Sequence, residues 1–291
     1  MSLVDGRTLL DADGLAAILG EPDVRVFDCT VHLRPDPPRT YRVESGREDW
    51  RAAHVPGAGF LDLPGALSDP DAGVPFTMPA PETLAAALGA AGVVDGARIV
   101  LYSTSHPMWA TRLWWMLRSI GVDAAVFDGG LAAWIEAGQP TEAGEVTLPP
   151  GTLTARPRPD LWADRDRVLA HVGDAAVCTV NALSPSVYRG DGGTNYGRPG
   201  HITGSVNVPY AALFADDAHR FADADAIRAA FDAVGAFERP VICYCGGGIS
   251  ATCDAFALVR LGHRDVAVYD GSMNEWVRDP SLPMTVGAEP G

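Results

Sequence analysis

The sequence is short of basic residues and has no long apolar segment. Lysine and arginine together number 22, against 37 aspartate and glutamate residues, and the formal net charge is −15. This excess of negative charge argues against nucleic acid and membranes as partners, because nucleic acids and anionic membrane surfaces are bound by basic patches. No apolar run approaches the roughly 18–20 residues of a membrane-spanning helix, and the N-terminus lacks the basic-then-apolar order of a secretory signal.

Cysteine is scarce as well. The sequence contains five cysteines at scattered spacings, without a C-x-x-C pair. This odd count argues against a disulfide framework or a zinc site and favours free thiols in a reducing compartment. The histidines show no ligand spacing either. We therefore expect a cytoplasmic protein that holds no metal ion and no bound cofactor.

The chain repeats itself. Its 291 residues, of which 47% are hydrophobic, suffice for two domains of roughly 100–150 residues each. The segment "RIVLYSTSHPMWATRLWWMLRSIGVDAAVFDGGLAAW" ends at Trp134 and aligns without a gap with "PVICYCGGGISATCDAFALVRLGHRDVAVYDGSMNEW", which ends at Trp276. A His-x-x-Gly sequence precedes each segment, at His54 and at His201. The two halves therefore share one order of elements.

A stretch rich in proline and glycine, from Gly144 to Asp160, separates the halves. Such a composition is typical of a linker. The predicted organisation is a first domain over residues 1–145, a linker over 146–160 and a second domain over 161–291.

Within each half, short β-branched segments alternate with longer helical patterns. The predicted strands include residues 98–103, 124–128, 240–245 and 266–270, and the predicted helices include 81–92 and 225–236. This alternation indicates an α/β fold in which each domain has a mostly parallel sheet flanked by helices. Ligands of such sheets bind beyond the carboxyl ends of the strands. Cys245 occupies such an end, whereas Ser103 takes its place in the first half, so chemistry is expected in the second half alone.

The residues after Cys245 suit an anion. Glycine tolerates positive φ and has no Cβ, so three successive glycines let backbone N–H groups turn toward one centre. A helix predicted to begin near Ile249 adds the positive end of its dipole, and Ser250 is expected to donate a hydrogen bond or to cap that helix. A thiolate or persulfide on Cys245 is then stabilised without a basic side chain. The predicted anion site consists of Gly246, Gly247, Gly248, Ile249 and Ser250.

The other cysteines are expected to play structural parts. Cys29, Cys178 and Cys243 lie in or beside predicted strands, where cysteine usually acts as a small hydrophobic residue. Cys253 lies on the helix after the loop, where it is a candidate to resolve an oxidised Cys245, although nothing in the sequence demands this.

Several segments match a known family. They are "CGGGISA" after the predicted strand, "HVPGA" and "HITGS" in the two halves, "FDGGLAAW" and "YDGSMNEW" after the loops, and "RLWWMLR" in the first half. Over nearly its whole length the chain resembles the tandem rhodanese sulfurtransferases. The resemblance implies an inactive first domain, a catalytic second domain and a site in the cleft between them. It also implies that Cys245 takes sulfane sulfur from a small-molecule donor as a persulfide and passes it to cyanide or a thiol, with a thioredoxin-like protein as a further candidate acceptor.

The loop favours 3-mercaptopyruvate as the donor. Family members that prefer thiosulfate usually carry Arg or Lys in the loop, and the neutral Cys-Gly-Gly-Gly-Ile-Ser resembles the Cys-Gly-Ser-Gly-Val-Thr loop of members that prefer 3-mercaptopyruvate. Thiosulfate stays open, because a serine of that subgroup's proposed relay falls on Gly247 and its Arg-Phe-Arg-Gly segment reads "VYRG" here. Replacing Gly246 by arginine is therefore expected to shift relative kcat/KM toward thiosulfate.

Three arginines and a histidine are candidates to bind the donor. Arg189 comes first, because the resemblance implies that "VYRG" is the substrate-binding segment, in which Arg189 keeps one of the subgroup's two arginines and Val187 replaces the other. A planar guanidinium holds a carboxylate or sulfonate through two hydrogen bonds. Arg198 is a second candidate and Arg112 a third, although an ion pair within the fold is an equally open role for Arg112. The family's proposed relay implies a role for His54, whereas its recurrence as His201 favours a structural role.

Two other classes of function are weighed against sulfur transfer. Cysteine phosphatases of related architecture have a Cys-x5-Arg loop, and Ala251 stands where that arginine is required. A rhodanese-like binding or sulfur-carrier module is the non-enzymatic alternative, and a complete loop around Cys245 argues against it. Thiocyanate release from sulfur-loaded protein on cyanide treatment separates the alternatives.

Overall fold

The structure, a computed structural model, describes residues 8–36, 39–192, 196–215 and 220–291. The chain divides into two compact units. The first comprises Met1–Asp71, Met78–Arg158 and Asp217–Arg220, and the second comprises Ala72–Thr77, Pro159–Asp216 and Phe221–Gly291.

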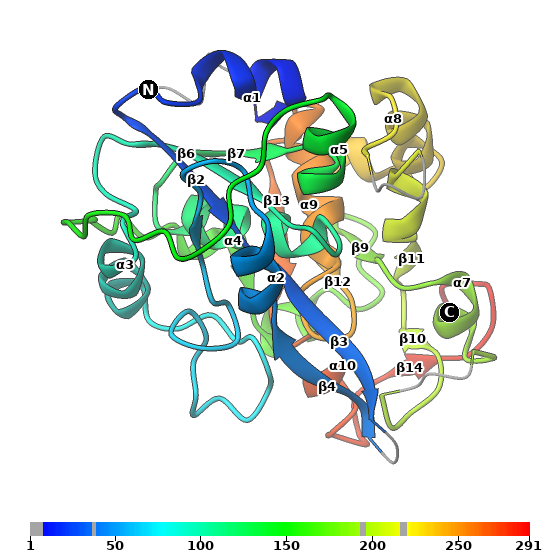
Figure 1. Ribbon diagram of the computed structural model, residues 1–291. Helices are drawn as coiled ribbons and strands as arrows, with labels where there is room; N and C mark the ends of the chain where they lie inside the picture. Colours follow the sequence, from blue (N-terminus) through cyan, green and yellow to red (C-terminus); the bar gives the residue numbers. More distant parts are fainter. Residues whose placement is uncertain (1–7, 37–38, 193–195, 216–219) are drawn as a thin grey trace. The chain divides into compact units, whose positions relative to one another are not determined.

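The first unit is built on a five-stranded parallel sheet (Figure 1). Its strands lie in the order β1 (Leu9–Leu10), β7 (Ala124–Phe127), β6 (Arg98–Tyr102), β2 (Val24–Asp28) and β5 (Gly59–Phe60). Its helices are α1 (Ala12–Ile18), α2 (Arg47–Ala52), α3 (Pro81–Ala90), α4 (Met108–Ser119) and α5 (Gly130–Glu136). An antiparallel hairpin, β3 (Val31–Asp36) and β4 (Arg39–Ser45), follows β2.

The second unit repeats this plan. Its parallel sheet has the order β11 (Val206–Asn207), β9 (Cys178–Asn181), β12 (Val241–Tyr244), β13 (Val266–Tyr269) and β8 (Trp162–Ala163). Its helices are α6 (Arg165–Ala170), α7 (Pro185–Arg189), α8 (Ala224–Asp232), α9 (Ala251–Arg260) and α10 (Ser272–Trp276), with 3-10 turns η2 (Pro159–Leu161), η3 (Tyr210–Leu213) and η4 (Ala236–Glu238). Strands β10 (His201–Ile202) and β14 (Met284–Thr285) form a short antiparallel pair. The repeat in the sequence thus folds into two sheets of matching order.

Helices cover both faces of the second sheet. Ile242 and Tyr244 of β12 pack in one apolar cluster with Val168 of α6 and Trp276 of α10. Side chains alternate between the faces of a strand, and α9 packs on β12 and β13 without entering that cluster, so it covers the opposite face. The predicted α/β class, with parallel sheets flanked by helices, is confirmed.

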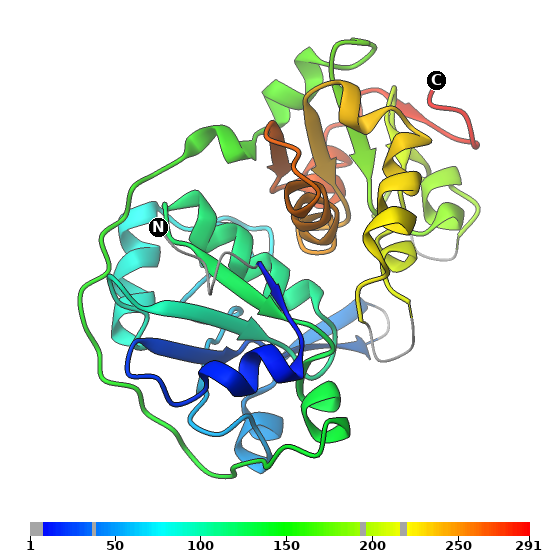
Figure 2. The same cartoon turned by 90° about the horizontal axis from the view of Figure 1, so that it is seen from above.

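The predicted linker is bound along the first unit. Residues 142–158, here called the strap, contain no helix and run along the outside of that unit as a long green trace (Figure 2). The Gly151 amide donates to the Gly89 carbonyl at 3.0 Å, Thr154 donates to Asp95 at 2.6 Å, and the Arg156 amide donates to the Ile120 carbonyl at 2.8 Å. The chain passes to the second unit between Arg158 and Pro159. The strap is therefore a part of the first unit rather than a free connection.

None of the helices in the described part of the chain has the length and apolar character needed to span a bilayer.

Candidate active site

Cys245 lies where the sequence places it, directly after the central strand β12. The residue is only 2% exposed. Strand β12 is flanked by β9 and β13, so the thiol sits at the carboxyl edge of a parallel sheet. Residues 246–250 lead from it to α9, which begins at Ala251 rather than near Ile249. This edge is the usual binding position in such sheets.

The start of α10 holds the cysteine loop from one side. The amides of Met273 and Asn274 donate to the carbonyls of Cys245 and Gly246 at 3.0 and 2.8 Å, and the Ser272 hydroxyl accepts the Cys245 amide at 3.1 Å. Ser272 has a positive φ of 48°, unusual for a residue other than glycine. Ser272 therefore keeps an unfavourable backbone conformation, and in this conformation its hydroxyl accepts the hydrogen bond from the Cys245 amide.

The start of α10 binds two carbonyls of the cysteine loop, whereas several backbone amides of the loop remain available as donors. The amides of Gly246, Gly247, Ile249 and Ser250 donate to no acceptor among the described residues. Gly248 has a φ of +73°, so one of the three glycines uses the left-handed conformation. Helix α9 follows and adds its N-terminal dipole. Several free amides at a helix N-terminus suit an anion bound at the loop.

Ser250 does not cap the helix by its side chain. It occupies the N-cap position, but its φ and ψ of −63° and −25° are helical and its hydroxyl makes no capping bond. An N-cap side chain needs an extended backbone to reach the following amides. The predicted cap is therefore absent.

The equivalent loop of the first half uses the same backbone donors internally. Ser103 follows β6 as Cys245 follows β12. Its hydroxyl accepts the amides of Ser105 and His106 at 3.3 and 3.4 Å. The Thr104 amide donates to the hydroxyl of Thr30 at 2.8 Å. The first loop thus lacks both the thiol and the free amides that would hold an anion.

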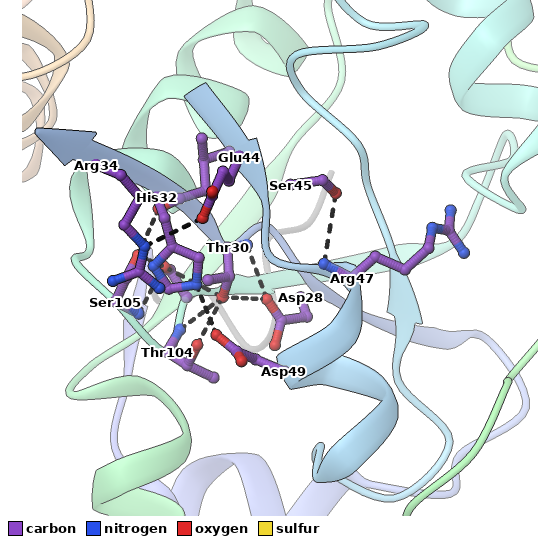
Figure 3. A network of polar contacts seen from close by, with 12 residues as sticks. Asp28, Thr30, His32, Arg34, Glu44, Ser45, Arg47, Asp49, Thr104 and Ser105 are labelled. Atoms are coloured by element: carbon purple, nitrogen blue, oxygen red, sulfur yellow. Dashed lines mark hydrogen bonds and ion pairs between the residues drawn. The ribbon is translucent and has the colours of Figure 1, made fainter. Parts of the chain in front are cut away.

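A buried carboxyl supports this first loop. Figure 3 shows Asp28, Thr30 and Thr104 turned toward one another. Asp28 accepts the amide and the hydroxyl of Thr30 at 2.8 and 2.5 Å, and the Thr30 hydroxyl lies 2.9 Å from that of Thr104. Burial raises the pKa of Asp28 to about 6, against the opposing effect of the Thr30 hydrogen bonds. The matching residue of the second half is the neutral Asn181.

Replacing Asp28 by asparagine is expected to stabilise the protein at alkaline pH. A carboxyl whose folded pKa is raised from 3.8 to about 6 loses folding free energy as pH rises through that interval, by about 3 kcal/mol in all. The asparagine amide oxygen can still accept the Thr30 bonds, as Asn181 accepts the Leu183 amide at 2.8 Å. Denaturant unfolding at pH 4 and pH 8 measures the effect, with the exposed Asp123→Asn as control. An equal effect of Asp28→Asn at both values would contradict the assignment.

His54 and His201 are held in the same way. Each is fully buried. His54 is stacked on Trp50 with its Nδ1 2.6 Å from the Trp50 carbonyl, and His201 is stacked on Tyr188 with its Nδ1 2.9 Å from the Tyr188 carbonyl. The matching environments favour the structural role. His54 differs in one respect, because its buried Nε2 has no hydrogen-bond partner among the described residues and lies 4.0 Å from a carboxylate oxygen of Glu142.

The three candidate arginines lie in different settings. Arg189 ends α7 and is half-exposed, with its Nε 3.0 Å from Asp191. Arg198 donates to the carbonyls of Asp279 and Leu282, both at 3.0 Å, so its guanidinium holds a backbone turn. Arg112 is fully buried on α4 of the first unit. No described hydrogen bond joins Arg189 or Arg198 to the cysteine loop, and their roles in binding stay predictions.

Four residues around the cysteine loop were not predicted from the sequence. A Cβ on Gly246 would overlap the hydroxyl end of Tyr196, and one on Gly247 would lie 2.8 Å from the side-chain nitrogen of Asn274. Ser272 and Asn274 replace Gly130 and Ala132 of the first half, a difference that the repeat makes visible. Asp254 on α9 is fully buried and is the fourth. Nothing in the local sequence pattern marks Tyr196.

Comparisons with known proteins agree with this geometry. Residues 186–279 match the family description "Rhodanese-like domain". A probable 3-mercaptopyruvate sulfurtransferase of Pseudomonas aeruginosa is 34% identical, over 96% of this chain and 98% of that protein. A mitochondrial thiosulfate/3-mercaptopyruvate sulfurtransferase of Arabidopsis thaliana is 30% identical, over 97% of this chain and 79% of that protein.

A solved structure extends the likeness to three dimensions. SseA from Escherichia coli, described as a 3-mercaptopyruvate sulfotransferase with the rhodanese fold, superposes with a TM-score of 0.81 at 29% identity, over 91% of this chain and 98% of that one. The curated relatives and this structure are each matched over more than nine-tenths of this chain. The chain therefore belongs to the tandem-domain rhodanese family and is a sulfurtransferase.

Proposed function

We propose that the protein moves sulfane sulfur from 3-mercaptopyruvate to a thiophilic acceptor through a persulfide on Cys245. The observation that carries this proposal is the buried thiol beside a loop that has no basic side chain and has four amides without an acceptor among the described residues. The names of the Pseudomonas and Arabidopsis relatives support the donor. The second of these names also includes thiosulfate, which stays the alternative donor.

The proposed reaction has two balanced steps. The Cys245 thiolate attacks the donor sulfur, the carbon–sulfur bond breaks, and its electron pair leaves with the enolate of pyruvate. The proton of the donor thiol then passes to the enolate carbon, which leaves pyruvate and a Cys245 persulfide anion. In the second step cyanide or a thiolate attacks the outer sulfur, and the electron pair of the sulfur–sulfur bond returns to Cys245 as its thiolate.

The loop distinguishes the two donors by charge. Thiosulfate is a compact dianion, and the sulfite that leaves it stays strongly anionic beside the attacked sulfur. The loop offers backbone dipoles to that charge, since residues 246–250 contain no cation. 3-Mercaptopyruvate carries one carboxylate, placed farther from the transferred sulfur, where an arginine outside the loop can hold it.

Steady-state kinetics with each donor and cyanide as acceptor tests the proposal. We expect a higher kcat/KM with 3-mercaptopyruvate at matched concentrations. Loss of one charge-assisted contact costs about 1.5–3 kcal/mol, or roughly 10- to 150-fold, so thiosulfate is expected to be used poorly rather than excluded. A higher kcat/KM with thiosulfate would show that the loop's neutrality does not set the donor.

Arg189→Ala is expected to impair the use of 3-mercaptopyruvate more than that of thiosulfate. If Arg189 leaves Asp191 to hold the donor carboxylate, its loss raises KM by roughly 10- to 150-fold with a smaller change in kcat. The matched control is Arg165→Ala, a half-exposed arginine of the same unit that pairs with Asp166. Equal kinetics of the two variants would remove Arg189 from the binding site.

The sulfur acceptor, the absence of a cofactor and the cellular location are parts of the same proposal. Cyanide and small thiols are the acceptors that the chemistry allows, with a thioredoxin-like protein as a further candidate. The reaction as written needs no cofactor beyond the persulfide sulfur itself. The cytoplasmic location expected from the composition also stays a prediction.

A further inference from the structure

The side-chain amide of Asn274 lies beside the cysteine loop and forms no hydrogen bond within the described part of the chain. Asn274 belongs to α10, and its backbone amide donates to the Gly246 carbonyl at 2.8 Å, which fixes the start of its side chain next to the loop. The residue is half-buried. Its side-chain amide is therefore held near the loop and can still reach a ligand.

This amide fills the space that a side chain on Gly247 would occupy. A Cβ on Gly247 would lie 2.8 Å from the Asn274 side-chain nitrogen, whereas the side-chain oxygen is more than 4 Å from that point. The nitrogen carries two N–H donors, so the donor end of the amide is turned toward the loop. The Gly247 backbone amide also has no acceptor among the described residues. A side-chain donor and a backbone donor thus lie next to each other, two residues after Cys245.

The repeat shows that these side chains belong to the catalytic half. Ser272 and Asn274 of α10 correspond to Gly130 and Ala132 in the half that lacks the thiol. The Ser272 hydroxyl is already used, because it accepts the Cys245 amide at 3.1 Å and donates to a backbone carbonyl at 2.7 Å. Of the two polar side chains, that of Asn274 is left for a ligand.

We propose that Asn274 is a further substrate-binding residue, whose side-chain N–H donates to the keto oxygen of 3-mercaptopyruvate as the carbon–sulfur bond breaks. The keto carbon is bonded to the carbon that carries the sulfur, so its oxygen lies close to the sulfur that Cys245 attacks. The electron pair of the broken bond becomes enolate charge on this oxygen, and a fixed donor stabilises that charge. Asn274 keeps its protons, and the enolate carbon takes its proton from the donor thiol. The inference rests on 3-mercaptopyruvate as the donor in the proposed function.

Single-turnover kinetics of Asn274→Ala tests the two half-reactions separately. Persulfide formation from 3-mercaptopyruvate, followed by intact mass, is expected to slow by roughly 10- to 100-fold, between the effect of an ordinary neutral hydrogen bond and that of a fully buried oxyanion donor. Thiocyanate release from the preloaded persulfide is expected to be unchanged, because no enolate forms in that step. Unchanged persulfide formation would overturn the proposal, as would an equal slowing of both half-reactions, which a distorted loop would produce.

The matched control is Asn207→Ala in the same unit. The Asn207 side-chain amide donates to the carbonyls of Asn181 and Leu183, both at 2.9 Å, so it is occupied within the fold. This variant is expected to unfold at a lower denaturant concentration and to keep both half-reaction rates. Asn274→Ala is expected to keep the unfolding midpoint, because its contact with the loop uses the backbone. Equal slowing of persulfide formation in the two variants would indicate a general loss of packing and would overturn the proposal.

A serine at position 247 provides a rescue that a merely structural role would not give. Gly247 does not have a positive φ, so its backbone accepts a side chain, and the Asn274 amide is what stands in the way. Gly247→Ser alone is expected to be slow because of this overlap. In Asn274→Ala the space is open, and the serine hydroxyl can donate in place of the amide. The double variant is expected to form the persulfide faster than either single variant, and a double variant slower than both would overturn the proposal.

These readouts fail separately from the proposed function. If wild type forms the persulfide on Cys245 from 3-mercaptopyruvate and Asn274→Ala forms it equally fast, sulfur transfer stands and the role of Asn274 falls. If 3-mercaptopyruvate leaves no sulfur on Cys245 in wild type, the proposed function falls and the role of Asn274 falls with it.

Discussion

Replacing Cys245 by serine is expected to lower sulfur transfer by at least about 10³-fold with either donor, because the attacking sulfur itself is removed. Serine nearly preserves the shape of the side chain at a site that is 2% exposed. The Ser272 and α10 contacts of this residue use its backbone, so they survive the substitution. Thiocyanate formation from donor and cyanide measures the loss, and denaturant unfolding checks that the fold is retained.

Two other buried cysteines of the second unit provide matched controls. Cys243 lies on the same strand and Cys253 on the following helix, and both are fully buried. Cys243→Ser and Cys253→Ser are expected to lose stability but to keep the persulfide, seen as one added sulfur atom in the intact mass after donor treatment. If Cys245→Ser keeps its turnover and Cys253→Ser loses it, then Cys253 on α9, rather than Cys245, carries the transferred sulfur.

Gly246→Arg is expected to cost roughly 10- to 100-fold in kcat/KM with 3-mercaptopyruvate, for a reason the sequence does not show. Any side chain at this position meets the hydroxyl end of the Tyr196 ring, and such crowding typically costs 1–3 kcal/mol. The arginine has to push Tyr196 aside before its charge can act on thiosulfate. The shift toward thiosulfate expected from charge alone is therefore accompanied by a loss with both donors.

A double variant separates crowding from charge. In Tyr196→Ala with Gly246→Arg the space is open, and kcat/KM with thiosulfate is expected to rise above that of Gly246→Arg alone. Tyr196→Ala by itself is the matched control for the lost ring. If Gly246→Arg gains thiosulfate activity without a second change, Tyr196 does not restrict the loop.

The fold and the position of the thiol follow from local patterns. Two gap-free copies of one strand–loop–helix segment predict two matching parallel sheets, and the break in the repeat at Ser103 and Cys245 distinguishes the loops. Strand ends and glycines are local features, so one sequence suffices to read them.

The residues that tune the loop depend on contacts between distant segments. Tyr196 reaches Gly246 from a segment without strand or helix. In the strap, Gly151 pairs with Gly89 through backbone atoms, and the Thr154 hydroxyl pairs with the side chain of Asp95, which lies 59 positions away in the sequence. Arg198 looks like an anion ligand in the sequence, yet its guanidinium binds two carbonyls. Buried polar partners of this kind depend on the packed tertiary structure.

The strap and the segment Ala72–Thr77 limit how the protein can be divided. A fragment that ends at Glu145 would expose the edge that Gly151, Thr154 and Arg156 cover, whereas one that ends at Arg158 keeps those bonds. The second unit also includes Ala72–Thr77, where the Gly73 carbonyl accepts a hydrogen bond from Arg278 at 2.9 Å, although this segment precedes the strap in the chain. The two halves repeat one plan, but no single cut between them yields two complete units. A shorter engineered catalyst would need residues 72–77 joined to it by circular permutation or by a new connection.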